Sequence, residues 1–156
     1  MAEGEFALVQ KYLELALHKT AAWVGEHDLY AMLADAAVQQ RDKSALQKYA
    51  PLAEEFALRY DHKLYLAIAH RAWGVVHLLA GEYSEAETRL KQALDLFMGL
   101  NTRYQIGRTL LELGELAADQ SNIPTARDHF TRALMAFEAM GALPDLTRTR
   151  EKMAVL

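Results

Sequence analysis

An all-α fold is the class that the sequence predicts, and three observations predict it. The 156 residues include only three prolines and eight glycines, so few positions break a helix. Helix-favouring Ala, Leu, Glu, Gln, Lys and Arg are abundant, and the Val, Ile and Thr alternation typical of strands is nowhere sustained. The chain also matches itself at a fixed shift that brings Gly74 onto Gly114, which indicates stacked copies of one helical unit.

The repeat is clearest between RAWGVVHLLAGEYSEAETRLKQALDLF (71–97) and LELGELAADQSNIPTARDHFTRALMAF (111–137). The shift aligns Gly74 with Gly114, Ala86 with Ala126, Leu90 with Phe130, Ala93 with Ala133 and Phe97 with Phe137. An earlier copy aligns only when the step is one residue longer, which places Ala45 under Ala86 and Tyr49 under Leu90. We therefore expect one domain, 1–156, with repeats at 26–66, 67–106 and 107–146.

Each copy predicts two helices joined by a turn. The first helix carries a small residue where a neighbouring helix can approach closely: Ala34, Gly74 or Gly114. The second carries small and large apolar residues at i, i+4 and i+7, which form one stripe. With flanking helices at 5–20 and 145–155, we expect about seven or eight helices. The predicted ranges are 5–20, 27–40, 44–60, 63–80, 84–99, 102–119, 123–140 and 145–155.

The starts of the second helices carry capping signals. The capping box S-x-x-E/Q occurs twice, as Ser44 with Gln47 and as Ser84 with Glu87. In the third copy Pro124 suits the first helical turn, so Ser121 or Asn122 must supply the cap.

Pro51 falls inside the predicted helix 44–60, where it removes a backbone hydrogen bond. We expect a kink there, or two short helices that meet near Tyr49–Pro51, and the sequence leaves the effect on the first repeat open.

Composition excludes several classes of function. The net charge is −4, with acidic and basic residues interspersed, so we expect no direct binding to nucleic acid. The chain has no cysteine, which excludes disulfides, thiolate zinc sites and cysteine nucleophiles. No signal peptide is evident, and no apolar stretch approaches the roughly 20 residues that span a bilayer. We expect a cytoplasmic protein without membrane contact.

Catalytic and metal sites are not indicated. His70 and His77 share a helix face, but metal-binding histidines on one helix are typically four apart and need a third ligand. We interpret both as partly buried packing residues. Glu112 and Glu115 are interpreted as surface carboxylates and not as acid–base catalysts. We expect no enzymatic activity, no cofactor and no metal.

The best copy resembles the tetratricopeptide repeat. Its pattern is Trp73-Gly74 followed by Gly81-x-Tyr83-x-x-Ala86-x-x-x-Leu90-x-x-Ala93. The resemblance implies a right-handed superhelix of antiparallel helix pairs, with the first helices along the concave side. The period here exceeds the usual period of the family, which is about 34 residues. Longer repeats of this kind are similar to those of maltose-regulator-type bacterial transcription activators.

The resemblance also implies a function. Ligand-facing positions of the family, carried onto this chain, predict a binding groove formed by Tyr30, Arg71, Val75, Arg108, Glu112, Glu115, Arg148 and Lys152. We expect an interaction scaffold that binds a peptide or partner protein in this groove, where the basic residues can meet an acidic peptide or carboxylate.

Self-association is a further expectation. The predicted helix 5–20 is apolar around more than one stripe, through Phe6, Leu8, Val9, Tyr12, Leu13, Leu15 and Leu17. We therefore expect a homodimer that buries this helix or 145–155, in a protein of bacterial signalling or transcription regulation. The alternative is a ligand-sensing domain of a transcriptional regulator that binds a small metabolite or sugar. The partner, the oligomeric state and membership of a larger regulator stay open.

Overall fold

The computed structural model describes residues 2–19 and 25–156, and side chains for 7–16, 25 and 28–156. Within these residues the chain forms helices and no strand, as predicted. The eight helices are α1 (Ala2–Lys19), α2 (Glu26–Gln40), α3 (Lys43–Arg59), α4 (Lys63–Ala80), α5 (Tyr83–Gly99), α6 (Arg103–Asp119), α7 (Ile123–Glu138) and α8 (Leu143–Ala154). Their ends lie within a few residues of the predicted ones.

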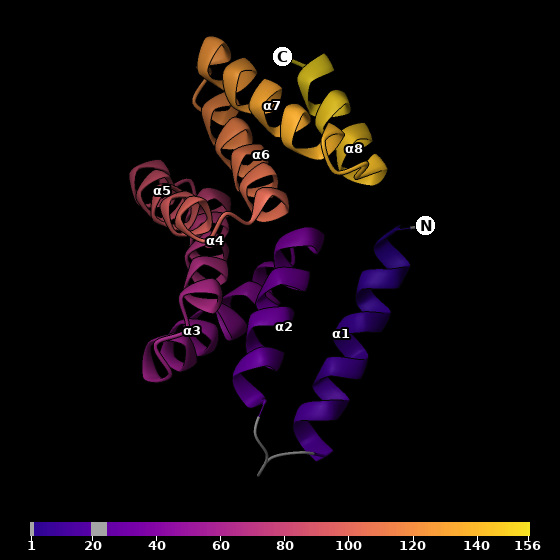
Figure 1. Ribbon diagram of the computed structural model, residues 1–156, viewed down its shortest axis with the longest axis vertical. Coiled ribbons are helices and arrows are strands. Elements are labelled where there is room, and N and C mark those ends of the chain that lie inside the picture. The colour runs from indigo at the N-terminus through magenta and orange to yellow at the C-terminus, as the bar shows by residue number, and fades with distance from the viewer. Residues whose placement is uncertain (1, 20–24) are drawn as a thin grey trace.

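The helices stack as antiparallel pairs in chain order (Figure 1). The pairs are α2 with α3, α4 with α5 and α6 with α7, and the second helix of each pair packs against the first helix of the next. Helix α1 packs on α2 as a second helix does, and α8 packs on α7 as a first helix does. The arrangement is the all-α superhelix that the repeat predicts, with α1 at one end and α8 at the other.

The backbone repeats with one constant step from the first complete pair onward. Left-handed residues occur within the pairs at Arg41 (φ 53°), Gly81 (77°) and Ser121 (59°), and between pairs at Asp61 (49°), Asn101 (54°) and Gly141 (65°). The longer step expected before the second copy is therefore wrong. It aligned residues of similar size, Tyr49 with Leu90, whereas the structure places the buried Ala50 at that position.

Close approach within two pairs depends on glycine. A Cβ added to Gly74 would lie 2.6 Å from Leu90 Cγ, and one added to Gly114 would lie 2.5 Å from Phe130 Cδ1. The large residue of the second helix thus occupies the space that the glycine leaves free. Ala34 stands at this position in α2 and is fully buried. The small residues predicted in the first helices are confirmed as sites of tight packing.

The two predicted capping boxes are wrong. Helix α3 begins one residue before Ser44, and its cap is Asp42, whose carboxylate accepts a hydrogen bond from the Ala45 N–H at 3.0 Å. Helix α5 likewise begins before Ser84, and its first flanking residue, Glu82, makes no side-chain cap bond. The left-handed turn fixes each start, so the serines fall inside the first turn.

The prediction for α7 is confirmed. Asn122 accepts a hydrogen bond from the Thr125 N–H at 3.3 Å, and Pro124 lies in the first turn.

Pro51 lies inside one continuous helix, α3, so the expectation of two short helices is wrong. Its ring is exposed, while Ala50 and Ala53 on the opposite side are fully buried. Packing on the buried side therefore holds the helix together across the missing hydrogen bond, and water can reach the carbonyl that loses its partner.

In the part of the chain that the structure describes, the search for a helix both long and apolar enough to cross a membrane finds none.

Candidate functional site

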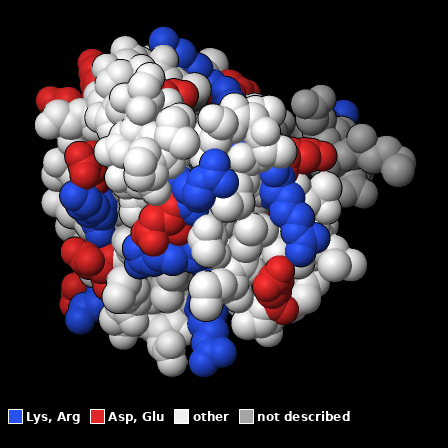
Figure 2. Space-filling view, turned by 90° about the horizontal axis from the view of Figure 1, so that it is seen from above, with Lys and Arg blue, Asp and Glu red and all other residues white. Residues whose placement is uncertain are grey.

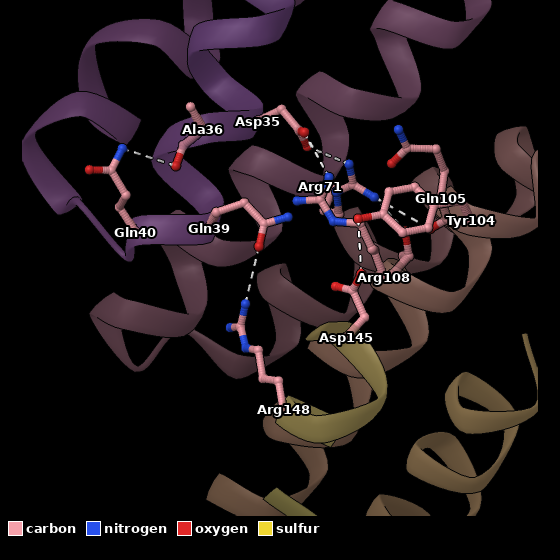
Figure 3. Close-up of polar contacts among 11 residues, drawn as sticks. Asp35, Ala36, Gln39, Gln40, Arg71, Tyr104, Gln105, Arg108, Asp145 and Arg148 are labelled. Carbon is pink, nitrogen blue, oxygen red and sulfur yellow. Dashed lines mark hydrogen bonds and ion pairs between the residues drawn. The ribbon is translucent and has the colours of Figure 1, made fainter. Parts of the chain in front are cut away.

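The candidate site is the face on which the first helices of the pairs, α2, α4 and α6, and the last helix, α8, present charged side chains to one another. Figure 3 shows Asp35 of α2 pointing toward Arg71 and Arg108, while Gln39 points toward Arg148 of α8. Two groups of charges can be distinguished by burial. We call them the Asp35 triad (Asp35, Arg71, Arg108) and the Glu115 cluster (Arg41, Glu112, Glu115, Arg148, Lys152).

The Asp35 triad joins three helices through one carboxylate. Arg71 Nη2 lies 2.6 Å from Asp35 Oδ1, and Arg108 Nη1 lies 2.7 Å from Asp35 Oδ2. Arg71 is fully buried and also donates to the Gln105 carbonyl at 3.3 Å. Its guanidinium carbon lies 5.1 Å from the centroid of the Phe97 ring. The single carboxylate therefore bridges two arginines that have little access to water, which leaves the triad with a net charge of +1.

The pKa values of the triad reflect this burial. Burial alone raises the pKa of Asp35, but the Arg108 and Arg71 guanidiniums outweigh it and hold that pKa below its ordinary value. Burial, with repulsion from Arg108, lowers the pKa of Arg71 to about 10. Arg71 thus stays protonated at neutral pH, and the triad keeps its ion pairs.

The Glu115 cluster gathers three cations around one carboxylate of α6. Arg41 Nη2 lies 2.6 Å from Glu115 Oε2, Lys152 Nζ lies 3.3 Å from the same oxygen, and Arg148 Nη2 lies 3.6 Å from Oε1. Arg41 also pairs with the buried Glu112 at 2.6 Å. Burial raises the pKa of Glu115, but the three cations outweigh that effect, so the net shift of this pKa is downward.

Exposure separates the two groups. The Arg148 and Lys152 side chains are 28% and 44% exposed, whereas those of Arg71 and Arg108 are 0% and 7% exposed. Figure 2 shows basic and acidic side chains intermixed on the face seen from above, without a large patch of either sign. The cations of the Glu115 cluster are therefore the basic groups of the site that solvent and partners can reach, whereas the carboxylates follow the opposite order, with the Asp35 side chain 26% and the Glu115 side chain 14% exposed.

The eight predicted groove residues fall into four places. Arg71 and Arg108 meet in the triad, and Glu112, Glu115, Arg148 and Lys152 meet in the Glu115 cluster. Val75 is fully buried in the core. Tyr30 lies apart, with its ring centroid 5.1 Å from that of Phe56. The expectation that Glu112 is a surface carboxylate is wrong, since it is 3% exposed. Their role in binding stays a prediction.

Sequence reasoning missed Asp35 and Arg41, which take part in most of these ion pairs. Asp35, Val75 and Glu115 occupy the same position of three successive repeats, so extending that column of the repeat would have identified Asp35. Arg41 has no such signal, because it lies in the left-handed turn after α2.

The two histidines singled out in α4 lie in separate environments. His70 Nδ1 lies 2.8 Å from Arg89 Nη1, and burial followed by the charge of Arg89 lowers its pKa. His77 Nδ1 lies 2.5 Å from a Glu82 oxygen. Across the described residues, no group of three or more His, Cys, Asp or Glu side chains could hold a metal ion.

Comparisons with known proteins agree with this architecture. The family described as Tetratricopeptide repeat matches residues 64–139, which span α4 to α7. The crystal structure of BtubC (BKLC) from P. vanneervenii resembles this chain with a TM-score of 0.64 and 15% identity. The likeness covers 99% of this chain and 75% of that chain, and at this identity it shows the fold alone. No curated protein matches the sequence.

Tetratricopeptide repeats generally mediate contacts between proteins, and all-helical repeats of this type are typically not catalytic. The family match lies on the pairs with the glycine-dependent packing, and the turns outside it continue the same backbone repeat. The chain therefore forms a tetratricopeptide-repeat-like domain, an all-α superhelix of antiparallel helix pairs.

Proposed function

We propose that this domain is a non-catalytic protein-interaction module that self-associates through α1. The observation that carries the proposal is an apolar stripe on the outer side of that helix. Leu8, Val9, Tyr12 and Leu15 are 52%, 45%, 63% and 43% exposed. We call these four residues the α1 stripe. Leu8, Tyr12 and Leu15 follow the i, i+4, i+7 spacing of one helix face.

Comparison with the other second helices makes the stripe unusual. In the register of the repeat, Leu8, Tyr12 and Leu15 correspond to three exposed polar residues of α5: Thr88, Gln92 and Asp95. In α3 the same positions hold Lys48, Leu52 and Glu55, and in α7 they hold Asp128, Arg132 and Met135. Each of the other second helices thus has at most one apolar residue at these three positions, whereas α1 has three. Contiguous exposed apolar surface of this kind typically marks an interaction site.

The order of residues in the stripe favours a second copy of the chain as its occupant. Leu8, Tyr12 and Leu15 read aliphatic, aromatic, aliphatic in either direction. Two antiparallel α1 helices related by a two-fold axis would therefore place Leu8 of one copy near Leu15 of the other, with the Tyr12 rings at the centre. One helix face is small for an interface, so we expect a weak dimer that forms as concentration rises.

Sedimentation of two matched variants tests this proposal. Tyr12→Glu places a charge at the centre of the stripe, and Gln92→Glu places the same charge at the equivalent exposed position of α5. We expect Tyr12→Glu to abolish the concentration-dependent dimer and Gln92→Glu to leave it intact. Equal behaviour of the two variants would contradict the proposal.

A second candidate surface is the Glu115 cluster, which we propose binds an acidic segment of a partner. Three cations surround Glu115, and all three are partly exposed, Lys152 the most at 44%. A carboxylate from a partner can compete with Glu115 for these cations, as the predicted groove requires. The triad offers no such opening because its arginines are buried and paired.

Fluorescence anisotropy with an oligoglutamate peptide tests this second surface. Lys152→Glu removes a cation of the cluster. Arg150→Glu makes the same change on the outer side of α8, where Arg150 pairs with Glu138 at 3.1 Å. We expect only Lys152→Glu to weaken peptide binding. Equal weakening by both would show that net charge alone attracts the peptide.

A further inference from the structure

A cavity of about 220 Å³ lies where the end of α6, the start of α7 and the end of α8 meet. We call it the α6–α8 cavity. Its apolar lining comes from Ala118 at the end of α6, Ile123 and Phe130 of α7, and Val155 and Leu156 after α8. Polar groups of Asp119, Glu115 and Lys152 line the rest.

Repeat geometry explains why the cavity is present. The positions of Ala118 and Ile123 are occupied one repeat earlier by Leu78 and Tyr83, which pack in the same apolar core as Leu90. Leu78 is larger than Ala118, and Tyr83 is larger than Ile123. The junction between α4, α5 and α6 is therefore filled by side chains that the junction between α6, α7 and α8 lacks.

The ends of the helices add to the difference. Leu116 lies inside α6 and is 2% exposed. The equivalent residue of the next repeat, Leu156, lies beyond the last turn of α8 and is only partly buried. The adjacent Val155, which also lines the cavity, is 83% exposed.

Phe130 gives the cavity a fixed floor. Its ring is 1% exposed and packs over Gly114, where an added Cβ would lie 2.5 Å from the ring. The ring thus fills the glycine's space in the adjoining helix. This packing holds the Phe130 ring in place, and the ring does not fill the cavity beside it.

Size and polarity define what the cavity can hold. An apolar cavity of about 150 Å³ accepts benzene, so this cavity has room for a phenyl ring or a branched aliphatic group. Lys152 uses one of its three donors on Glu115, and Asp119 is exposed. Polar groups beside an apolar interior suit a side chain carried on a peptide backbone, whose carbonyl and N–H groups need partners.

We propose that the α6–α8 cavity is a receptor for one bulky apolar side chain, of phenylalanine or leucine size, from a partner polypeptide. The inference rests on the proposed function as an interaction module and adds a residue class that the partner must present. It does not depend on the α1 stripe, which lies on the first helix of the chain, whereas the cavity is formed by the last three.

The test is a ¹⁵N–¹H NMR titration of the full chain with N-acetyl-phenylalanine amide, with N-acetyl-alanine amide as the matched probe. We expect the phenylalanine probe to shift amide signals of α6, α7 and α8, and the alanine probe to shift none of them. The double variant Ala118→Leu/Ile123→Tyr copies the filled junction into the open one. This variant should raise the melting temperature of the protein. It should also raise the dissociation constant of the phenylalanine probe by at least about tenfold.

Two controls separate binding from a packing defect. Ala154→Leu adds bulk at an exposed position of α8 outside the cavity and should leave probe binding unchanged. If wild-type protein shows no shift at millimolar phenylalanine probe, the cavity is only a packing defect and the proposal is wrong. Shifts that persist in the filled variant, or binding of benzene without the phenylalanine probe, would also overturn it. None of these outcomes changes with the α1 dimer, whose failure is read from the mass of the protein in solution.

Discussion

The Asp35 triad and the Glu115 cluster use the same chemistry, carboxylates between basic side chains from different helices, yet their basic side chains differ in access to water. In the triad, two buried guanidiniums share one carboxylate. In the Glu115 cluster, three partly exposed cations share one carboxylate. Burial therefore separates a structural contact, which must stay paired, from a contact whose ions can be exchanged with a partner.

The largest expected effect comes from removing the centre of the triad. Asp35→Ala leaves Arg71 and Arg108 buried without their anion, and we expect a loss of about 3–5 kcal/mol in the free energy of unfolding. Urea denaturation followed by circular dichroism measures it. Replacing all three residues together, as Asp35→Leu with Arg71→Met and Arg108→Met, should recover most of that loss, because no charge is then left buried.

Removal of the Glu115 carboxylate should reduce the free energy of unfolding by less than removal of Asp35. Glu115→Ala leaves Arg148 and Lys152 in partial contact with water, so we expect a loss of about 1–2 kcal/mol in the same urea experiment. A loss as large as that of Asp35→Ala would contradict the distinction between the two regions.

Acid should destabilise the fold in two steps. Burial followed by nearby arginines lowers the pKa values of His70 and His129 from the ordinary 6.5. The unfolded chain therefore binds protons first, and stability falls as the pH decreases from about 6.5 through the folded pKa values. Asp35 has a pKa below its ordinary 3.8, so its contribution is complete above about pH 4 and disappears as the pH falls through the lowered value.

Urea midpoints measured across pH check both steps. His70→Gln should reduce the loss that begins near pH 6.5, and Asp35→Asn should remove part of the loss below about pH 4 at the expense of stability at neutral pH. A flat profile between neutral pH and pH 5 would contradict the assignment to the histidines.

Added salt should have the smallest effect on the free energy of unfolding, and it distinguishes the Asp35 triad from the Glu115 cluster by their access to ions. The Debye length falls from about 10 Å at 0.1 M salt to about 3 Å at 1 M, which screens exposed charges more than buried ones. Added sodium chloride should therefore reduce the difference in unfolding free energy between wild type and Glu115→Gln. The difference between wild type and Asp35→Asn should change little. Equal screening of both pairs would show that the triad is open to ions.

Local pattern was sufficient to predict the helices and their pairing. Gly74 and Gly114, with the stripes of the second helices, reflect packing between neighbours in sequence, and such packing leaves a periodic signal. The helix starts were less predictable, since a left-handed residue such as Arg41 fixes where α3 begins and the sequence motif at Ser44 lies inside the helix. Backbone conformation in a turn of two residues leaves almost no periodic signal.

The site was predicted only in part, because curvature of the whole superhelix decides which first-helix residues are exposed. Arg71 and Lys152 were both predicted as basic residues of the groove, yet one is fully buried and the other is 44% exposed. Asp35 reaches Arg108 from 73 residues away. A contact across that separation leaves no signal within a single repeat. The sequence alone therefore could not show that Arg71 and Arg108 are paired and buried instead of lining an open groove.

Self-association through α1 is the central claim, and light scattering of the wild-type chain over a concentration series tests it most directly. The monomer has a mass of 17.6 kDa. The α1 stripe predicts that the weight-average mass rises toward twice this value between micromolar and millimolar concentrations. A mass that stays at 17.6 kDa across the whole series would contradict the claim.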